Sequence, residues 1–187
     1  MLLSLLTLAV VAPSALRGDT LQHRAGLYAG FGLGPAYLNY DCRGCPQAGS
    51  GFAGYGVARI GTAVSPHFTV GIDLHSWHRQ GTTDGATSTI LTVNYYPVAE
   101  GGTFLRAGAG LASFRGIDFA DGPHESGSGT AFMLGAGYDA RFDRKLSLTP
   151  AVAILYDDIG TTTIVGIPER RGTKAWLVAV SIGMTWH

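Results

Sequence analysis

The sequence predicts an all-β protein: an eight-stranded antiparallel up-and-down transmembrane β-barrel. Three observations predict it. Segments of roughly ten to fifteen residues show the two-residue alternation of strands. Short and long connections between these segments alternate along the chain. The last segment carries Trp176 and Trp186 on one face, at a spacing that suits the two surfaces of a bilayer. No segment has the apolar period of an amphipathic helix.

The composition restricts the class of function. The 187 residues suit one domain. Thirteen Lys and Arg balance thirteen Asp and Glu, which argues against nucleic-acid binding because such proteins carry a basic surface. Only 14% of residues are charged, and 28 are glycine. Low charge and abundant glycine indicate closely packed strands rather than the surface of a soluble enzyme.

The first twenty residues, MLLSLLTLAVVAPSALRGDT, have the pattern of a secretory signal peptide. The apolar run Leu2–Val11 is too short to span a bilayer as a helix, and small residues follow at Ala12, Ser14 and Ala15. A buried N-terminal helix is the alternative interpretation. We expect a signal peptide over about residues 1–18 and an exported barrel domain over 19–187.

Eight strands are predicted from the alternation and the turn residues. They are Ala25–Tyr40, Gly51–Ser65, His67–Gln80, Ala86–Pro97, Thr103–Gly116, Ser128–Phe142, Lys145–Asp157 and Thr173–His187. Three connections are tight, at residues 65–67, 98–102 and 143–144. The other four are longer and more polar: DCRGCPQAGS, GTTDG, IDFADGPHESG and DIGTTTIVGIPERRG. In a meander all tight turns then lie at one end, as in outer-membrane barrels with short periplasmic turns and long external loops.

The last strand predicts where the membrane lies. Trp176 and Trp186 are separated by about 33 Å along an extended strand. A strand tilt near 40° reduces this to about 25 Å along the membrane normal, the height of a lipid-facing band. Val178, Val180 and Ile182 lie between them on the same face. We expect the two rings to mark two aromatic belts.

Four charged residues fall on the opposite, inward face of their strands. They are Arg59, Asp73, Arg106 and Asp139. Unpaired buried charges are costly, so we expect a paired polar network in the lumen. An ion path is the alternative. Side chains fill the interior of an eight-stranded barrel, so no open pore is predicted.

Several segments carry a family resemblance: GLYAGFGLG, FLRAGAGLASFRG, FMLGAGYDARF, LSLTPAVAILY and VAVSIGMTW. With these the chain resembles the small outer-membrane β-barrel superfamily of the OmpA, OmpX and OmpW type. The resemblance implies a place in the outer membrane of a Gram-negative-type bacterium, in contact with its lipid and lipopolysaccharide. Ser181–Trp186 resembles the signal read by the barrel-assembly machinery, although His187 follows it. These motifs specify architecture rather than activity.

The only cysteines, Cys42 and Cys45, lie in the first long connection. A C-x-x-C pair can be a redox motif or half of a metal site. A redox motif needs a βαβ context, and a zinc site needs two further ligands. Export to an oxidising compartment favours a local disulfide that stiffens the loop.

Ser76 and His78 are the candidate catalytic residues. Residues two apart on a strand share a face, so both would point outward near the external rim. Lipid A deacylases of the outer membrane similarly place a His and a Ser two apart on their outer wall. No acid on an adjacent strand is available to orient the histidine, which favours ordinary polar rim residues.

Asp118, Asp121, His124 and Glu125 cluster in the third long connection and could bind a divalent cation. In the fourth, Asp157, Asp158 and Glu169 add acidic surface, which Arg170 and Arg171 partly offset. Polar loops commonly have this composition, so no metal site is predicted. No phosphate-binding motif is present, and no cofactor is expected.

Three hypotheses follow. The first is a non-enzymatic, monomeric outer-membrane barrel that supports the envelope or presents its loops to an unidentified surface ligand. The second is a lipid A-modifying acyl hydrolase that uses Ser76 and His78. The third is a soluble ligand-binding barrel of lipocalin type, whose interior would hold large apolar residues. Here the inward sets are expected to be small and charged.

Overall fold

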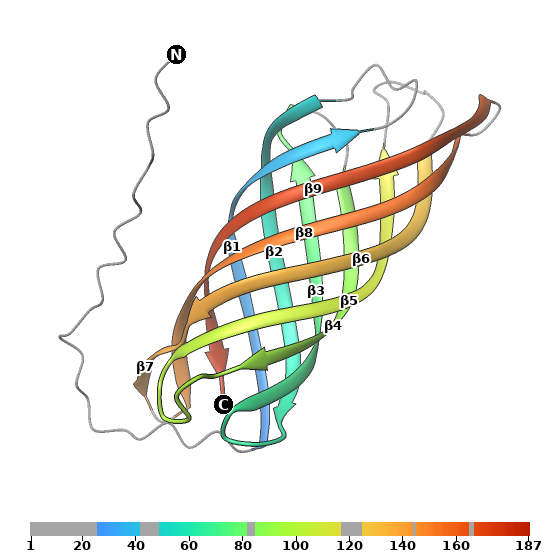
Figure 1. The fold of residues 1–187 in the computed structure, drawn as a ribbon. Helices are drawn as coiled ribbons and strands as arrows, with labels where there is room; N and C mark the ends of the chain where they lie inside the picture. Colours follow the sequence, from blue (N-terminus) through green and yellow to red (C-terminus); the bar gives the residue numbers. More distant parts are fainter. Residues whose placement is uncertain (1–25, 42–48, 82–84, 117–124, 144, 165–166) are drawn as a thin grey trace, which may run out of the picture.

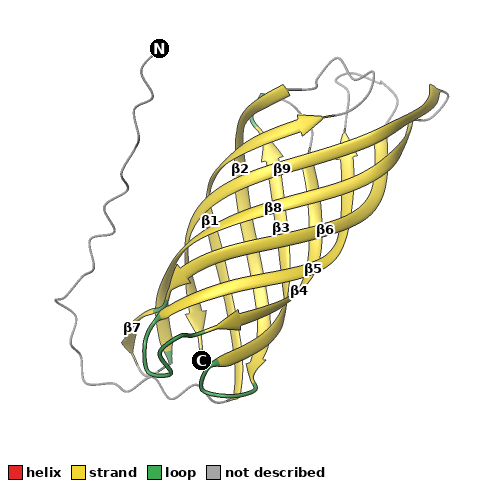
Figure 2. Cartoon of the chain, in the orientation of Figure 1, coloured by secondary structure: helices red, strands yellow, loops and turns green. Residues whose placement is uncertain are grey.

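The chain folds into a closed antiparallel barrel of eight strands (Figure 1). The computed structural model describes residues 26–41, 49–81, 85–116, 125–143, 145–164 and 167–187. The strands are β1 (Gly26–Asp41), β2 (Gly49–Ala63), β3 (Phe68–Arg79), β4 (Gly85–Tyr95), β5 (Thr103–Gly116), β6 (Glu125–Tyr138), β7 (Ala140–Asp143), β8 (Leu146–Ile164) and β9 (Ile167–Trp186). Figure 2 shows only strands and connections in this part of the chain. No helix within it is long and apolar enough to cross a bilayer.

Each strand pairs with its neighbour in the chain, and β9 pairs with β1 to close the barrel. β6 and β7 both pair with β8, so they are two parts of one barrel strand interrupted at Asp139. The register across this interruption is unbroken, because Gly137 lies opposite Ala151 and Ala140 lies opposite Leu148. The predicted eight-stranded meander is therefore confirmed.

The short connections and the C terminus lie at one end of the barrel (Figure 1). The turn after β2 is closed by the amide of Val64, which donates to the carbonyl of Phe68 at 3.0 Å. The turn after β4 has a bond of 2.9 Å from the Gly101 amide to the Val98 carbonyl. We call this the turn end and the opposite one the loop end.

The fourth long connection corrects the sequence-based prediction. β8 does not end at Asp157, and β9 does not begin at Thr173; their ladder continues as a ribbon to Ile164 opposite Ile167. Gly160 and Gly172 have φ angles of 68° and 79°, in the left-handed region that favours glycine. The register shifts on both sides of Gly160, as at β-bulges. These glycines therefore allow the strands to bend and continue. The polar composition of the segment had predicted a loop instead.

The outer wall is apolar on all sides. Leu33, Leu134 and Ile182, on three different strands, are 64%, 65% and 57% exposed. Large apolar side chains point outward in the same way from every long strand. A soluble monomer rarely exposes so much continuous apolar surface, whereas a bilayer accommodates it.

The lumen has two different halves, which corrects a second expectation. Polar and charged side chains fill the half near the turns. The half near the loop end holds large apolar residues rather than small and charged ones. They include Leu38, Tyr40, Trp77, Ile90, Phe114, Leu155, Ile159 and Leu177. The alternation identifies which face of a strand is inward, but it does not show how large the inward side chains are at each level of the barrel.

Candidate functional site

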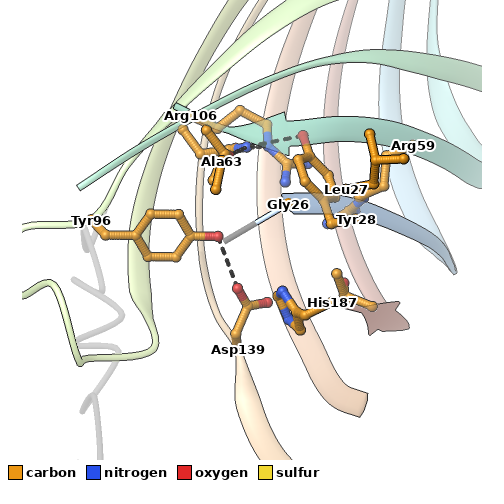
Figure 3. Close-up of a pocket in the computed structure, with 12 residues that line it drawn as sticks. Gly26, Leu27, Tyr28, Arg59, Ala63, Tyr96, Arg106, Asp139 and His187 are labelled. Atoms are coloured by element: carbon orange, nitrogen blue, oxygen red, sulfur yellow. Dashed lines mark hydrogen bonds between the residues drawn. The ribbon is translucent and has the colours of Figure 1, made fainter. Parts of the chain in front are cut away.

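A polar hollow lies inside the mouth of the barrel at the turn end (Figure 3). Its walls include Tyr28 from β1, Arg59 from β2 and Arg106 from β5. Asp139 and the C-terminal His187 close the opposite side. Period-two alternation brings Tyr28, Arg59 and Arg106 together, because each occupies an inward position of its strand. Asp139 lies between β6 and β7, and His187 directly follows β9.

Asp73 is the centre of the polar network. It is fully buried, and its Oδ2 lies 3.1 Å from Nη1 of Arg106. Thr92 donates to its Oδ1 at 3.2 Å. His75 Nε2 lies 3.8 Å from Oδ2, too far for a hydrogen bond, while Nδ1 of His75 lies 2.7 Å from the hydroxyl of Tyr55. The carboxylate is thus held from several strands at once.

Arg106 extends this network toward the mouth. Its Nε donates to Oδ1 of Asn94, whose amide nitrogen donates to Thr69 at 2.7 Å. The guanidinium also lies over the ring of Phe104, 5.0 Å from its centroid. These contacts fix the position and orientation of the guanidinium.

The other two predicted lumen charges are also buried, in different surroundings. Asp139 accepts hydrogen bonds from Tyr96 at 2.9 Å and from Thr149 at 2.8 Å. Arg59 forms no ion pair within 4.0 Å in the described part of the chain, and its Nε is buried without a hydrogen-bond partner. The structure therefore brings all four charges into the lumen and pairs Asp73 with Arg106 directly.

Asp157 is a lumen residue, whereas the sequence pattern predicted it on the surface of the fourth long connection. It is 1% exposed. Trp77 Nε1 donates to Oδ2 at 3.2 Å, and Ser88 donates to Oδ1 at 3.0 Å. Continuing the two-residue alternation of β8 from Ala153 and Leu155 would have placed Asp157 on the inward face.

Aromatic rings lie close to the Asp157 carboxylate. Tyr40 stacks on Phe114 with centroids 5.5 Å apart, and Trp77 lies 6.4 Å from Phe114. Leu155 and Leu177 pack into the same cluster. We call this cluster the apolar plug, and it occupies the lumen between the polar network and the loop end.

Ser76 and His78 both point outward from β3 and are exposed. Opposite Ser76 lie Gly56 on β2 and Thr87 on β4, and opposite His78 lie Gly54 and Gly85. None of these neighbours is an acid. The described residues also contain no group of three or more His, Cys, Asp or Glu that could hold a metal ion.

Trp176 and Trp186 lie on the outer face of β9, 55% and 44% exposed. Trp176 packs against Tyr156 at 4.6 Å, and Trp186 packs against Phe31 at 5.9 Å, measured between ring centroids. Further aromatic residues lie outward at the two levels, including the pairs Tyr37–Phe52 and Phe68–Tyr95.

Other sequence-based sites lie outside the described residues. They are the signal peptide, the Cys42–Cys45 pair and the loop residues Asp118, Asp121 and His124.

Solved structures with a similar fold decide the architecture. Neisserial surface protein A superposes with a TM-score of 0.57 at 14% identity, covering 87% of this chain and 97% of that one. The outer membrane protein OprG from Pseudomonas aeruginosa gives 0.54 at 16% identity, covering 90% and 100%. The chain has the fold of the small outer-membrane β-barrels.

A third small outer-membrane barrel, the attachment invasion locus protein Ail of Yersinia pestis, was solved with a heparin analogue, sucrose octasulfate. It superposes with a TM-score of 0.55 at 11% identity, covering 86% of this chain and 99% of that one. No protein-family profile matches the sequence, and no curated protein matches it.

Proposed function

We propose that this chain is a non-enzymatic integral barrel of the bacterial outer membrane, which acts structurally or through its external surface and does not form an open pore. The apolar outer wall supports the membrane location. The outward side chains between Trp176 and Trp186 are Val178, Val180 and Ile182, which are exposed, and Met184, which is partly buried. Apolar side chains such as these are stable in contact with the hydrocarbon core of a bilayer.

The apolar plug is the observation that carries this proposal. Phe114 is 1% exposed, and Leu155 is fully buried. An aqueous path through an apolar constriction of packed side chains is opposed by dewetting. Below the plug, the Asp73–Arg106 pair occupies the centre of the lumen. The barrel is therefore a filled support rather than a conduit.

The surface role rests on the loop end. The β8–β9 ribbon continues past the last β1–β9 pair, Asp41 opposite Lys174. Figure 1 shows it reaching beyond the neighbouring strands. A backbone-bonded ribbon holds its tip more firmly than an irregular loop does. We expect the barrel to be monomeric, to be inserted by the barrel-assembly machinery and to contact outer-membrane lipid and lipopolysaccharide.

Planar-bilayer recording tests the filled lumen. The refolded protein should give no discrete conductance steps at moderate voltage. Shortening plug residues in the double variant Phe114→Ala/Leu177→Ala should introduce them, because it removes two large side chains from one constriction. Regular steps from the wild-type protein would overturn the proposal of a closed barrel.

The second candidate function is lipid A acyl hydrolysis by Ser76 and His78. The observation in its favour is that both residues are exposed on the outer wall and line one groove. Mass spectrometry of lipid A from a Gram-negative host, with and without the protein, separates the two functions. We expect identical spectra. A lost acyl mass that Ser76→Ala abolishes would establish the enzyme instead.

A further inference from the structure

The groove that contains Ser76 and His78 on the outer wall has the features of a binding site. It lies at the loop end over β3, β4 and β5. Its outward lining residues are Ser76, His78, Thr87, Ser113 and Arg115. Two features of these residues, their register and their charge, indicate what the groove accepts.

The register forms a row of hydroxyl groups. Ser76 lies opposite Thr87, Thr87 opposite Ser113, and Ser113 opposite Ser128. All four are exposed on the outer face. We call them the hydroxyl row. The outward residues nearer the turn end include Leu74 and Leu111, 47% and 70% exposed, so the row borders the apolar band at its external edge.

Two nitrogen-bearing side chains, the His78 imidazole and the Arg115 guanidinium, lie one step further toward the loop end. His78 lies opposite Gly85, and Gly85 lies opposite Arg115. β3 and β5, which flank β4, are about 10 Å apart. Gly85 between them has no side chain, and the His78 ring lies beside it. Gly54, the β2 partner of His78, also faces open space on the β2 side.

The charge of this sector differs from that across the barrel. On the other side of the rim, Lys174 lies opposite both Asp158 and Asp41, so its charge is balanced. Around the groove, no described outward residue of β3, β4 or β5 is a carboxylate. At the groove, the formal charge of the described outward residues of β3, β4 and β5 is the positive charge of Arg115.

We infer that this groove binds a phosphate group on the headgroup of an outer-leaflet glycolipid. The inference rests on the proposed function, because it requires the loop end to face the outer leaflet. The Arg115 guanidinium offers paired N–H donors that match phosphate oxygens. Hydroxyls of the row can donate to the same group, and His78 supplies a further N–H donor. Acyl chains would then lie over Leu74, Leu91 and Leu111.

The experiment measures binding of fluorescent bisphosphorylated lipid A to the refolded full-length barrel domain in detergent, with EDTA present to remove bridging cations. Arg115→Gln should weaken binding about tenfold, because it removes a charge-assisted pair. His78→Gln should weaken it less. Thr87→Val, which changes no charge, tests the hydroxyl row and should also weaken binding. Lys174→Gln is the matched control, because it removes one rim cation outside the groove, and it should stay within about twofold.

Dephosphorylated lipid A and inorganic phosphate complete the design. The inference predicts weak binding of the dephosphorylated lipid and no competition by millimolar inorganic phosphate. Equal binding of both lipids would overturn it, as would equal losses in Arg115→Gln and Lys174→Gln. Full competition by inorganic phosphate would make the groove a phosphate site rather than a lipid site. Heat-modifiable gel mobility shows that each variant is folded.

These outcomes differ from a failure of the proposed function. Altered lipid A mass would contradict the non-enzymatic barrel, yet the groove could still bind phosphorylated lipid as its substrate. Binding without phosphate dependence would remove the groove site and leave the closed barrel as it stands.

Discussion

Asp73 and Arg106 form an ion pair across a strand that belongs to neither of them. Asp73 lies on β3 and Arg106 on β5, with β4 between them, and their charged atoms are 3.1 Å apart. Thr92 of the intervening strand donates to the same carboxylate. Both charged side chains are buried. The pair therefore ties three strands together on the inside of the barrel.

Arg106→Met should lower the free energy of unfolding by about 3–5 kcal/mol, because it leaves Asp73 buried without its cation. Urea unfolding of the protein refolded into lipid vesicles measures this. The double variant Asp73→Asn/Arg106→Met should recover most of the loss. Arg115→Met, an exposed position, is the control and should change stability little. Additive losses in the double variant would contradict a direct pairing.

Trp77→Phe should cost about 1–3 kcal/mol, because it removes one of two donors to the buried carboxylate of Asp157. The same substitution in an Asp157→Asn background should cost clearly less, since no charge is then left without a donor. Packing losses are common to both backgrounds and cancel in this comparison. Equal costs would show that Trp77 acts by packing alone.

The three tryptophans provide a depth measurement. Single-tryptophan variants are made by changing the other two residues to Phe, and fluorescence is recorded in lipids brominated at different depths. Trp176 and Trp186 should be quenched most by bromines near the headgroups, because both are exposed on the outer face and tryptophan favours the headgroup level. Trp77 is only 2% exposed and lies in the lumen, so it should resist all of them. Strongest quenching of Trp176 by bromines at the bilayer centre would contradict its predicted position at the headgroup level.

Gly160→Val should loosen the β8–β9 ribbon without unfolding the barrel. A residue with a side chain at φ 68° costs about 1–2 kcal/mol. Amide hydrogen exchange should accelerate beyond Asp158 and remain slow at Leu155. Thr161→Val, at an exposed neighbouring position with no such constraint, is the control. Unchanged exchange in Gly160→Val would show that the bulge does not limit the ribbon.

The sequence alone determined the strands, their number and their lipid-facing sides. β5 begins and ends where the alternation predicted, at Thr103 and Gly116. The outward sets were readable because lipid requires large apolar side chains at every second position, a rule that acts within one strand. The same alternation predicted the outward positions of Trp176 and Trp186 on β9.

Only the tertiary structure decided which inward groups meet. Arg106 pairs with Asp73 on a non-adjacent strand, whereas Arg59, directly opposite Asp73 in the β2–β3 ladder, does not. Asp157 meets Trp77 across the lumen, and the ribbon continues through Gly160 where the composition indicated a loop. Strand stagger and side-chain reach across the closed barrel set these contacts, and neither is encoded in the alternation of a single strand.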